Sequence, residues 1–271
     1  MRSFSEFKFL SATSSFEECR GVVIGCPLES STSIPGCSRA PNYIREASWR
    51  IESYSPYQRK DLKEIPLCDL GNFLLPPSGA SIKKSFSLIE EKIEEVLKFD
   101  KKLIILGGDH LVTLPVVRAI KKRETNLRIL HLDAHLDERK EWRGEKFTHA
   151  SVMYRIREEK IPVVHLGIRS LSKEEKDIPF YSLSNPPEME QGGKYYLSLD
   201  MDFFDPSIAP AVSNPEPGGE NFSSFLDWLL ALPPLEVVGI EIVEVNPLVE
   251  GIHITSVLAA TVIRELILKF W

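Results

Sequence analysis

Residues 127–137 read LRILHLDAHLD, an apolar run of β-forming residues that passes directly into acidic and histidine side chains. A nearly continuous apolar strand is typical of a parallel sheet that is covered by helices on both faces. Ligands of such sheets bind beyond the carboxyl ends of the strands. The stretch therefore predicts a buried strand that delivers Asp133, His135 and Asp137 to a site at its end.

Two further segments repeat this arrangement. Residues 103–110, LIILGGDH, end in His110, and residues 195–205, YYLSLDMDFFD, carry Asp200 and Asp202 directly after an apolar run. A single Asp at a strand end is most often a turn or helix-cap residue. Three strands that all end in this way favour a shared site instead. We expect the side chains of the three segments to form one site for two divalent metal ions.

Strand and helix patterns alternate along the chain. Apolar β-type runs are expected at residues 21–26, 103–106, 127–132, 162–168, 195–199 and 237–243. Helical periodicity predicts helices over residues 85–99, 114–122, 222–232 with Asn221 as its cap, and 256–270 with Thr255 as its cap. This alternation predicts an α/β fold, a three-layer α/β/α sandwich with a mostly parallel central sheet. Residues 1–271 are expected to form a single domain, in which the Pro/Gly/Ser-rich stretches 29–41 and 206–219 are loops over the site.

The composition is that of an ordinary globular protein, with 43% hydrophobic and 27% charged residues. A net charge of -6 argues against a nucleic-acid partner and suits a cationic ligand. The four cysteines (Cys19, Cys26, Cys37 and Cys68) show no CxxC spacing, which favours the reduced thiols of a cytoplasmic protein. No apolar run approaches the roughly 20 residues of a membrane span, so no membrane partner is expected.

The residue types at the three strand ends bear on the metal and on the chemistry. Carboxylates and imidazoles without a thiolate favour Mn²⁺ or another borderline ion over a structural zinc site. Two ions about 3.5–4 Å apart would share a water molecule and lower its pKa enough to give hydroxide near neutral pH. Of the other histidines, His131 is expected in the core or behind a metal ligand, and no chemistry is assigned to His165 and His253.

With these motifs in place, the chain resembles the ureohydrolases, the family of arginase, agmatinase and formiminoglutamase. The resemblance runs from near Ser31 to the last helix, and its anchors are GGDH at 107–110, DAHLD at 133–137, SLDMD at 198–202 with Asp205 and Pro206 beyond it, and EIVEVNP at 241–247. It implies the family's sandwich fold and two Mn²⁺ ions per subunit, or two other divalent ions in their place. One ion would be held by His110, Asp133, Asp137 and Asp200, and the other by Asp133, His135, Asp200 and Asp202.

The resemblance also implies three catalytic residues in the single domain. Asp137 would orient the metal-bridging hydroxide toward the guanidinium carbon of the substrate, in addition to its role as a ligand. Glu244 would meet the planar guanidinium with two parallel hydrogen bonds. His149, within FTHAS at 147–151, would pass a proton to the leaving amine, a task for which imidazole is suited near neutral pH.

The loop after the second metal motif bears on the substrate. Residues 138–146, ERKEWRGEK, lack the Asn and Ser with which arginases recognise an α-carboxylate, and they resemble agmatinases, as do residues 148–153, 167–170 and 35–45. The predicted reaction is therefore hydrolysis of agmatine to putrescine and urea, a step of polyamine biosynthesis. A departure from the family pattern, SNP at 213–215 where Gly-Thr-Pro is common, alters the border of the pocket.

Charges in the same loop leave the substrate open. The acidic residues would neutralise the ammonium end of agmatine, or they are solvated loop charges: Glu138, Glu141 and Glu145. The basic residues could equally meet the carboxylate of guanidinobutyrate: Arg139, Lys140 and Arg143. Arginase, guanidinobutyrase and formiminoglutamase activities are the alternatives on the same scaffold.

Two more distant functions are weighed against a ureohydrolase. A deacetylase-like reaction would use one zinc ion, whereas the pair Asp200 and Asp202 favours two ions. A non-catalytic protein with this fold would have no need of the complete ligand set together with His149 and Glu244. By resemblance, the protein is expected to form a homo-oligomer, a trimer or hexamer, with the apolar last helix and its end, Phe270 and Trp271, available for subunit packing.

Overall fold

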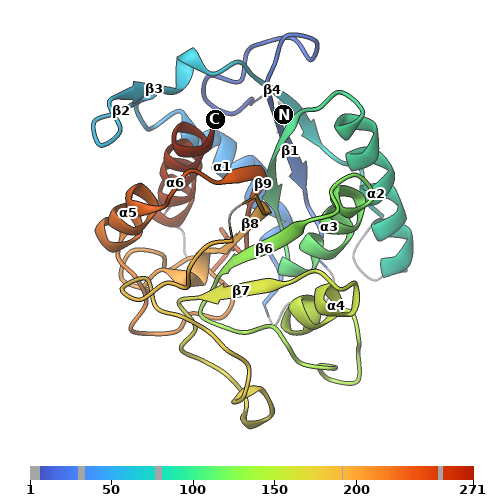
Figure 1. Ribbon diagram of the computed structural model, residues 1–271. Helices are drawn as coiled ribbons and strands as arrows, with labels where there is room; N and C mark the ends of the chain where they lie inside the picture. The colour runs from blue at the N-terminus through green and yellow to red at the C-terminus, as the bar shows by residue number, and fades with distance from the viewer. Residues whose placement is uncertain (1–6, 30–33, 77–80, 191, 250–252) are drawn as a thin grey trace.

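The computed structural model describes residues 7–29, 34–76, 81–190, 192–249 and 253–271 (Figure 1). Within these ranges, seven parallel strands form the central sheet in the order β4-β1-β5-β9-β8-β6-β7. Their bounds are β1 Gly21–Cys26, β4 Leu67–Asn72, β5 Lys102–Gly107, β6 Leu127–Leu132, β7 Val163–Leu166, β8 Lys194–Asp200 and β9 Glu236–Val243. A separate antiparallel pair is formed by β2 Tyr54–Ser55 and β3 Lys60–Asp61.

Helices cover both faces of the sheet, so the fold is the predicted three-layer α/β/α sandwich (Figure 1). One outer layer contains α1 Ala40–Ser48, α5 Phe222–Ala231 and α6 Ile254–Phe270, and the other contains α2 Ile82–Leu97, α3 Thr113–Lys121 and α4 Val152–Glu158. Each layer closes its own apolar core. Ile44, Phe225 and Ile263 lie in the first core, and Phe86 and Val116 in the second. Burial on both faces explains why the strand sequences are apolar throughout.

The predicted elements are found, with shifted ends. Asn221 caps α5 as expected, since its side chain accepts a hydrogen bond from the backbone N–H of Ser224 at 2.9 Å. The predicted cap of the last helix is wrong: α6 begins at Ile254 after His253, and the Thr255 hydroxyl instead accepts from the backbone N–H of Ala211 at 2.9 Å. The Thr255 hydroxyl is therefore used by a neighbouring loop and does not cap the helix.

Three elements of the sandwich were not predicted: β4, α1 and α4. The sequence of β4, LCDLGN, contains Asp, Gly and Asn, which are depleted in strands. Pairing with β1 along one edge of the sheet decides its conformation. The end of the chain also differs from expectation, because Phe270 and Trp271 are partly buried against the first core instead of being exposed.

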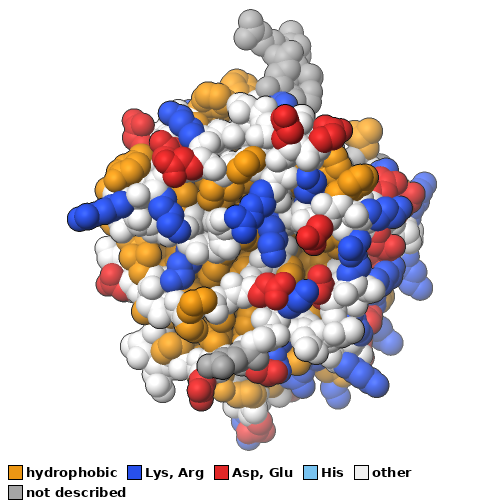
Figure 2. Space-filling view, turned by 45° about the horizontal axis from the view of Figure 1, so that its top comes forward, with side chains coloured by type: hydrophobic (Ala, Val, Ile, Leu, Met, Phe, Trp, Pro, Cys, Tyr) orange, Lys and Arg blue, Asp and Glu red, His pale blue; other side chains and the backbone are white. Residues whose placement is uncertain are grey.

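None of the described helices combines the length and the apolar composition that a bilayer span requires. The face seen in Figure 2 carries basic and acidic side chains interspersed with apolar ones. No single sign of charge dominates that view.

Candidate metal centre

Four neighbouring strands, β5, β9, β8 and β6, bring the sequence motifs together at their carboxyl ends. His110 begins the short helix η4 (His110–Val112) just after β5, and Glu244 directly follows β9. Asp200 is the last residue of β8, Asp202 lies in the helical turn η7 (Met201–Phe203), and residues 133–137 follow β6. Motifs that are far apart in the chain thus meet because their strands are adjacent in the sheet.

Tight packing fixes the turn that carries His110. A Cβ atom at Gly108 would lie 2.1 Å from the backbone carbonyl oxygen of Leu28, so only glycine fits there. The carbonyl oxygen of Gly108 accepts a hydrogen bond from the backbone N–H of Glu244 at 2.8 Å. The backbone N–H of His110 in turn donates to Glu244 Oε1 at 2.8 Å. The GGDH and EIVEVNP motifs are therefore locked to each other.

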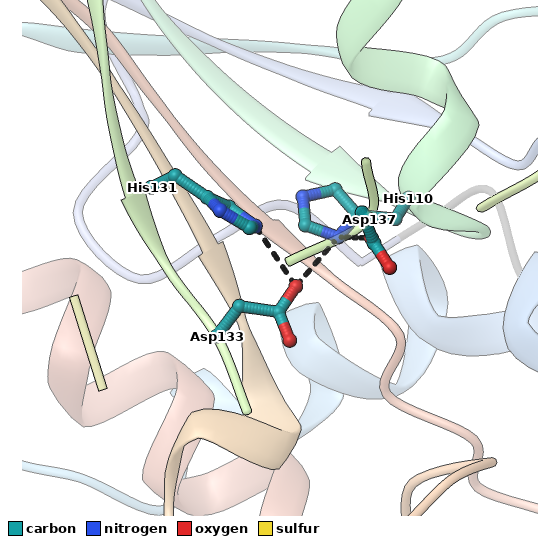
Figure 3. A group of neighbouring side chains, drawn as sticks. All are labelled: His110, His131, Asp133 and Asp137. Carbon is teal, nitrogen blue, oxygen red and sulfur yellow. Dashed lines mark hydrogen bonds and ion pairs between the residues drawn. The ribbon is translucent and has the colours of Figure 1, made fainter. Parts of the chain in front are cut away.

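Three carboxylates surround one nitrogen of His110. Its Nδ1 lies 3.2 Å from Asp133 Oδ2, 3.1 Å from Asp137 Oδ2 and 3.4 Å from Asp200 Oδ2. Figure 3 shows Asp133 and Asp137 turned toward this ring. All four side chains are buried, and Nδ1 has no hydrogen-bond partner among the described residues. A buried nitrogen facing three carboxylates is a position for a cation.

The opposite nitrogen of His110 is held by a hydrogen-bond chain. His110 Nε2 lies 2.8 Å from Ser198 Oγ, and the Ser198 hydroxyl donates to Glu241 Oε1 at 2.6 Å. Because that hydroxyl hydrogen goes to Glu241, the oxygen accepts from Nε2–H. Burial raises the pKa of Glu241, and three hydroxyl donors lie on its carboxylate: Ser198, Thr113 and Tyr196. This tautomer leaves Nδ1 available as a ligand.

A second cluster adjoins the first. His135 Nδ1 lies 3.0 Å from Asp202 Oδ2 and 3.5 Å from Asp133 Oδ1. Ligand atoms of Asp133, His135 and Asp202 lie within 4.8 Å of one another, and Asp133 also belongs to the group with His110 and Asp137. One carboxylate thus faces both clusters, as a bridging ligand of two ions would.

The carboxylates of the two clusters outnumber the positive charges near them. Burial and neighbouring carboxylates raise the pKa of Asp137, raise that of Asp202 to about 6, and raise that of Asp200 well above its ordinary range. Burial opposes protonation of His135, yet Asp133 and Asp202 raise its pKa to about 12. Oxygen-rich donors crowded in this way fit divalent cations that accept carboxylate and imidazole ligands.

His131 lies directly behind Asp133. Burial lowers the pKa of His131 to about 3, so its ring is neutral, and Nε2 donates to Asp133 Oδ2 at 2.9 Å (Figure 3). Its Nδ1 is 2.8 Å from Nδ1 of His165, whose Nε2 lies 3.3 Å from Glu138 Oε1. His131 therefore supports Asp133, one of the two roles expected for it. The part played by His165 was missed, although pairing of β6 with β7 sets the two histidines opposite each other.

Glu244 and His149 stand beside the clusters. Glu244 is buried, its Oε2 accepts from Cys37 Sγ at 3.3 Å, and burial with the nearby Asp109 raises its pKa to about 7. His149 begins the short helix η5 (His149–Ser151), and its Nδ1 has no hydrogen-bond partner among the described residues. Ligand atoms of Asp109, His149 and Glu244 come within 4.8 Å of one another. A carboxylate and an imidazole thus flank the centre.

A cavity of about 430 Å³ opens onto the centre. Six of the predicted site residues line it: His135, Asp137, His149, Asp200, Asp202 and Glu244. His110 and Asp133 are fully buried beneath. The stretch 206–219 contributes Ser213 to Glu216 to the wall, as expected of a loop over the site. The other such loop, 29–41, reaches the site through Cys37, while Ser31 lies outside the described residues.

The acidic residues of the 138–146 loop do not line this cavity. Glu138 is buried beside His165 and Arg157, and Glu141 and Glu145 are exposed. The loop contributes Arg139 and Trp142 instead, with the guanidinium carbon of Arg139 4.4 Å from the centre of a Trp142 ring. Of the two readings of these acidic residues, their absence from the wall of this cavity favours solvated or buried loop charges over contacts with a substrate bound in it.

Comparison with known proteins agrees with this geometry. Residues 20–185 and 186–269 match the model of the Arginase family. An agmatinase of Halalkalibacterium halodurans is 33% identical, over 98% of this chain and 97% of that protein. An N(1)-aminopropylagmatine ureohydrolase of Thermus thermophilus is 33% identical, over 86% of this chain and 84% of that protein.

A solved structure shares the fold. The agmatine ureohydrolase of Thermoplasma volcanium superimposes with a TM-score of 0.84 at 30% identity, over 98% of this chain and 95% of that one. The match extends over the sheet, both helical layers and the strand ends that carry the candidate ligands. The chain therefore belongs to the arginase family, the ureohydrolases, which are hydrolases of guanidino compounds.

Proposed function

We propose that this enzyme hydrolyses agmatine to putrescine and urea with two Mn²⁺ ions. The proposed metal ligands are His110, Asp133, His135, Asp137, Asp200 and Asp202. The observation that carries the proposal is the convergence of four carboxylates and two imidazoles beneath a cavity whose wall also holds Glu244 and His149. Near-full-length similarity to agmatinases supports the choice of substrate.

Bound at this centre, the ions would lower the pKa of a water molecule and so supply a nucleophile near neutral pH. Glu244 binds the guanidinium, because an ionised carboxylate matches that planar cation with two hydrogen bonds. Backbone donation from His110 and the thiol of Cys37 hold this carboxylate in place. Asp137, whose Oδ2 faces His110, orients the nucleophile toward the guanidinium carbon.

His149 moves the proton in this proposal. Its ring lines the cavity while Nδ1 is free of hydrogen bonds to the described residues. Hydrolysis of a guanidinium releases an amine, which needs a proton as the carbon–nitrogen bond breaks. An imidazole beside Glu244 can deliver that proton to the departing nitrogen.

A second candidate substrate is N(1)-aminopropylagmatine, which adds an aminopropyl arm to agmatine. A second cavity of about 470 Å³ shares Arg139 and Glu175 with the first and is also lined by Glu141 and Glu174. This adjoining space, which is lined by acidic residues together with Lys140 and Arg157, leaves room for a longer polyamine tail. The Thermus thermophilus relative carries that substrate in its name.

The proposal extends to the organisation of the protein. Residues 1–271 act as a single catalytic domain, supported by a family match that spans residues 20–269 in two adjoining segments. The chain forms a homo-oligomer, a trimer or hexamer. Exposed apolar residues beside the start of α6 support subunit contacts there, since Leu248 is 50% and Ile254 45% exposed. Light scattering of the purified protein measures the subunit number.

The deciding experiment is urea release by the Mn²⁺-loaded protein from agmatine, N(1)-aminopropylagmatine, arginine and guanidinobutyrate, with formamide release from formiminoglutamate. We expect the highest kcat/KM for agmatine. Higher kcat/KM for the aminopropyl compound selects the second candidate. Preference for arginine, guanidinobutyrate or formiminoglutamate contradicts both, and the absence of any product rejects an active ureohydrolase.

The metal assignment is tested by Asp200→Ala. This change removes a carboxylate that faces His110 and that the family resemblance assigns to both ions, so we expect Mn²⁺ content to fall to one ion or fewer per chain and turnover to drop by about 10³-fold or more. Asp227→Ala, an exposed Asp of α5, serves as the matched control. Retention of two ions and full turnover by the Asp200 variant would refute the ligand set.

A further inference from the structure

We propose that Glu216 binds the distal ammonium group of the substrate and so selects a dicationic guanidine over a carboxylate-bearing one. The inference rests on the proposed function, since it concerns the tail of a guanidine whose head lies at Glu244. It assigns a specificity role to a residue of the loop between β8 and α5, a loop whose sequence at 213–215 departs from the common family turn.

Glu216 lies next to the proposed metal ligand His135, on the side of the imidazole ring opposite Asp202. Nδ1 of His135 faces Asp202 at 3.0 Å, while Nε2 on the other side of the ring is 3.9 Å from Glu216 Oε1. Glu216 and His135 both line the cavity, and their side chains are 37% and 27% exposed. The carboxylate is therefore on the outer side of the centre, where the tail of a bound guanidine would emerge.

The loop around Glu216 is held rigidly by backbone contacts. The guanidinium of Arg169 donates to the carbonyl oxygen of Glu216 at 2.7 Å and to that of Asp202 at 2.6 Å. Asp205 Oδ2 accepts from the backbone N–H of Gly218 at 2.8 Å. Prolines on both sides of Glu216 further restrict the chain. The Ser170 hydroxyl orients the side chain by donating to Glu216 Oε1 at 3.0 Å. A carboxylate that is already in place binds a cation with little ordering cost.

The other acidic residues of the cavity wall are engaged elsewhere. Glu175 accepts from the backbone N–H groups of Glu138 and Ser172, at 3.1 and 2.7 Å, and is buried. Glu244 faces His110 and Cys37. The hydroxyl contact of Glu216 is neutral, and His135 is neutral when it holds a metal ion. Glu216, whose side chain is 37% exposed, is thus the wall carboxylate that a second cation can reach.

Arg139 is the residue that would favour the opposite selection, because its guanidinium could bind a substrate carboxylate. It also borders the second cavity, whose lining contains the acidic residues Glu141 and Glu174 together with the basic residues Lys140 and Arg157. It stacks on Trp142 at 4.4 Å, an arrangement that holds the guanidinium at the wall. Two carboxylates, Glu244 for the head and Glu216 for the tail, match a dication such as agmatine.

The test compares three guanidines that share a four-carbon chain: agmatine with an ammonium, butylguanidine with a methyl group, and 4-guanidinobutyrate with a carboxylate. Replacing Glu216 by Gln should lower kcat/KM for agmatine by about tenfold more than for butylguanidine, because only agmatine loses a charge pair. Glu216→Lys should move the preference toward guanidinobutyrate. A gain on that substrate cannot arise from misfolding.

Glu91→Gln, which removes the same charge from an exposed Glu of α2 that does not line the cavity, is the matched control and should leave the ratio of agmatine to butylguanidine activity within about twofold of the parent ratio. Equal losses on agmatine and butylguanidine in Glu216→Gln, with no gain in Glu216→Lys, would overturn the role of Glu216 while leaving agmatine hydrolysis intact. A parent enzyme that is inactive on agmatine and butylguanidine would overturn the proposed function and this inference with it.

Discussion

Two of the proposed catalytic residues have a strained backbone. Asp137 and Glu244 have φ angles of 55° and 60°, in the left-handed region that side chains disfavour at a cost of roughly 1–2 kcal/mol. Hydrogen bonds hold both in place: the Asp137 carbonyl accepts from the N–H of Met153 at 3.0 Å, and the Glu244 N–H donates to Gly108. Such conformations persist where surrounding contacts over-determine them and are concentrated at active sites.

The negative charge of Glu244 should be needed for efficient turnover of agmatine. Glu244→Gln keeps the size of the side chain but presents one acceptor oxygen and no negative charge, so kcat/KM for agmatine should fall about 10²-fold or more. The Mn²⁺ content should stay at the parent value. Steady-state kinetics and elemental analysis measure the two effects. Glu236→Gln, at the exposed start of β9, the strand that Glu244 follows, is the control. Unchanged kcat/KM would remove Glu244 from guanidinium binding.

The hydrogen bond from His131 to Asp133 should strengthen metal binding. His131→Phe replaces the buried ring by one of similar shape and removes the N–H that donates to Asp133 Oδ2. Loss of such a partner behind a metal ligand typically costs 10- to 100-fold in affinity, so Mn²⁺ should bind that much more weakly in a calorimetric titration. His253→Phe, at the partly exposed start of α6, is the control. Equal affinities in the two variants would contradict the supporting role.

At the scale of elements, the strand ends carry the chemistry and the helices provide the frame. Asn221→Ala removes the cap of α5, which should lower the free energy of unfolding by about 1 kcal/mol and Tm by about 2–4 °C. Mn²⁺ affinity should be unaltered, because α5 packs in an outer layer. Calorimetric unfolding measures the change, with the exposed Asn126→Ala as control. A loss of Mn²⁺ affinity would show that the Asn221 cap of α5 also affects the metal site.

For the whole molecule, the buried carboxylates link folding to pH and metal. The pKa of Asp202 is about 6 in the metal-free fold against 3.8 ordinarily, so the folded state binds more protons than the unfolded chain between about pH 4 and 6. Its contribution to stability is therefore lost as pH rises through this window, by on the order of 2–3 kcal/mol. Denaturant unfolding of chelator-treated protein at several pH values measures this slope.

With Mn²⁺ bound, the free energy of unfolding should instead rise with pH over this range. Divalent ions stabilise the ionised carboxylates, and Mn²⁺ at about 100 times its Kd adds roughly 2.7 kcal/mol per site to the free energy of unfolding. The Asp202→Asn variant should lack part of the pH dependence seen in the metal-free parent. A metal-free parent that gains stability between pH 4 and 6 as steeply as the variant would contradict the raised pKa.

Features that depend on neighbouring residues in the chain could be predicted from the sequence, whereas features that depend on contacts between distant segments could not. The apolar strands, the amphipathic helices α2 and α3, the cap Asn221 and the strand-end ligands depend on local pattern, and the structure brings those ligands together. The same local reading missed β4 because Asp, Gly and Asn weaken strand propensity, and pairing with β1 overrides it. It also misplaced the start of α6, since Thr255 serves a distant backbone N–H.

Periodicity and strand-end residues by themselves predicted the sandwich of this protein, and its motifs carried the family resemblance and the expectation of a two-metal site. Only the tertiary structure decided what surrounds that site. Strand order set His165 behind His131, burial turned Glu138 away from the cavity, and loop packing brought Glu216 to its wall. These are contacts between segments distant in the chain, and no local pattern of residue types records which segments will pack together.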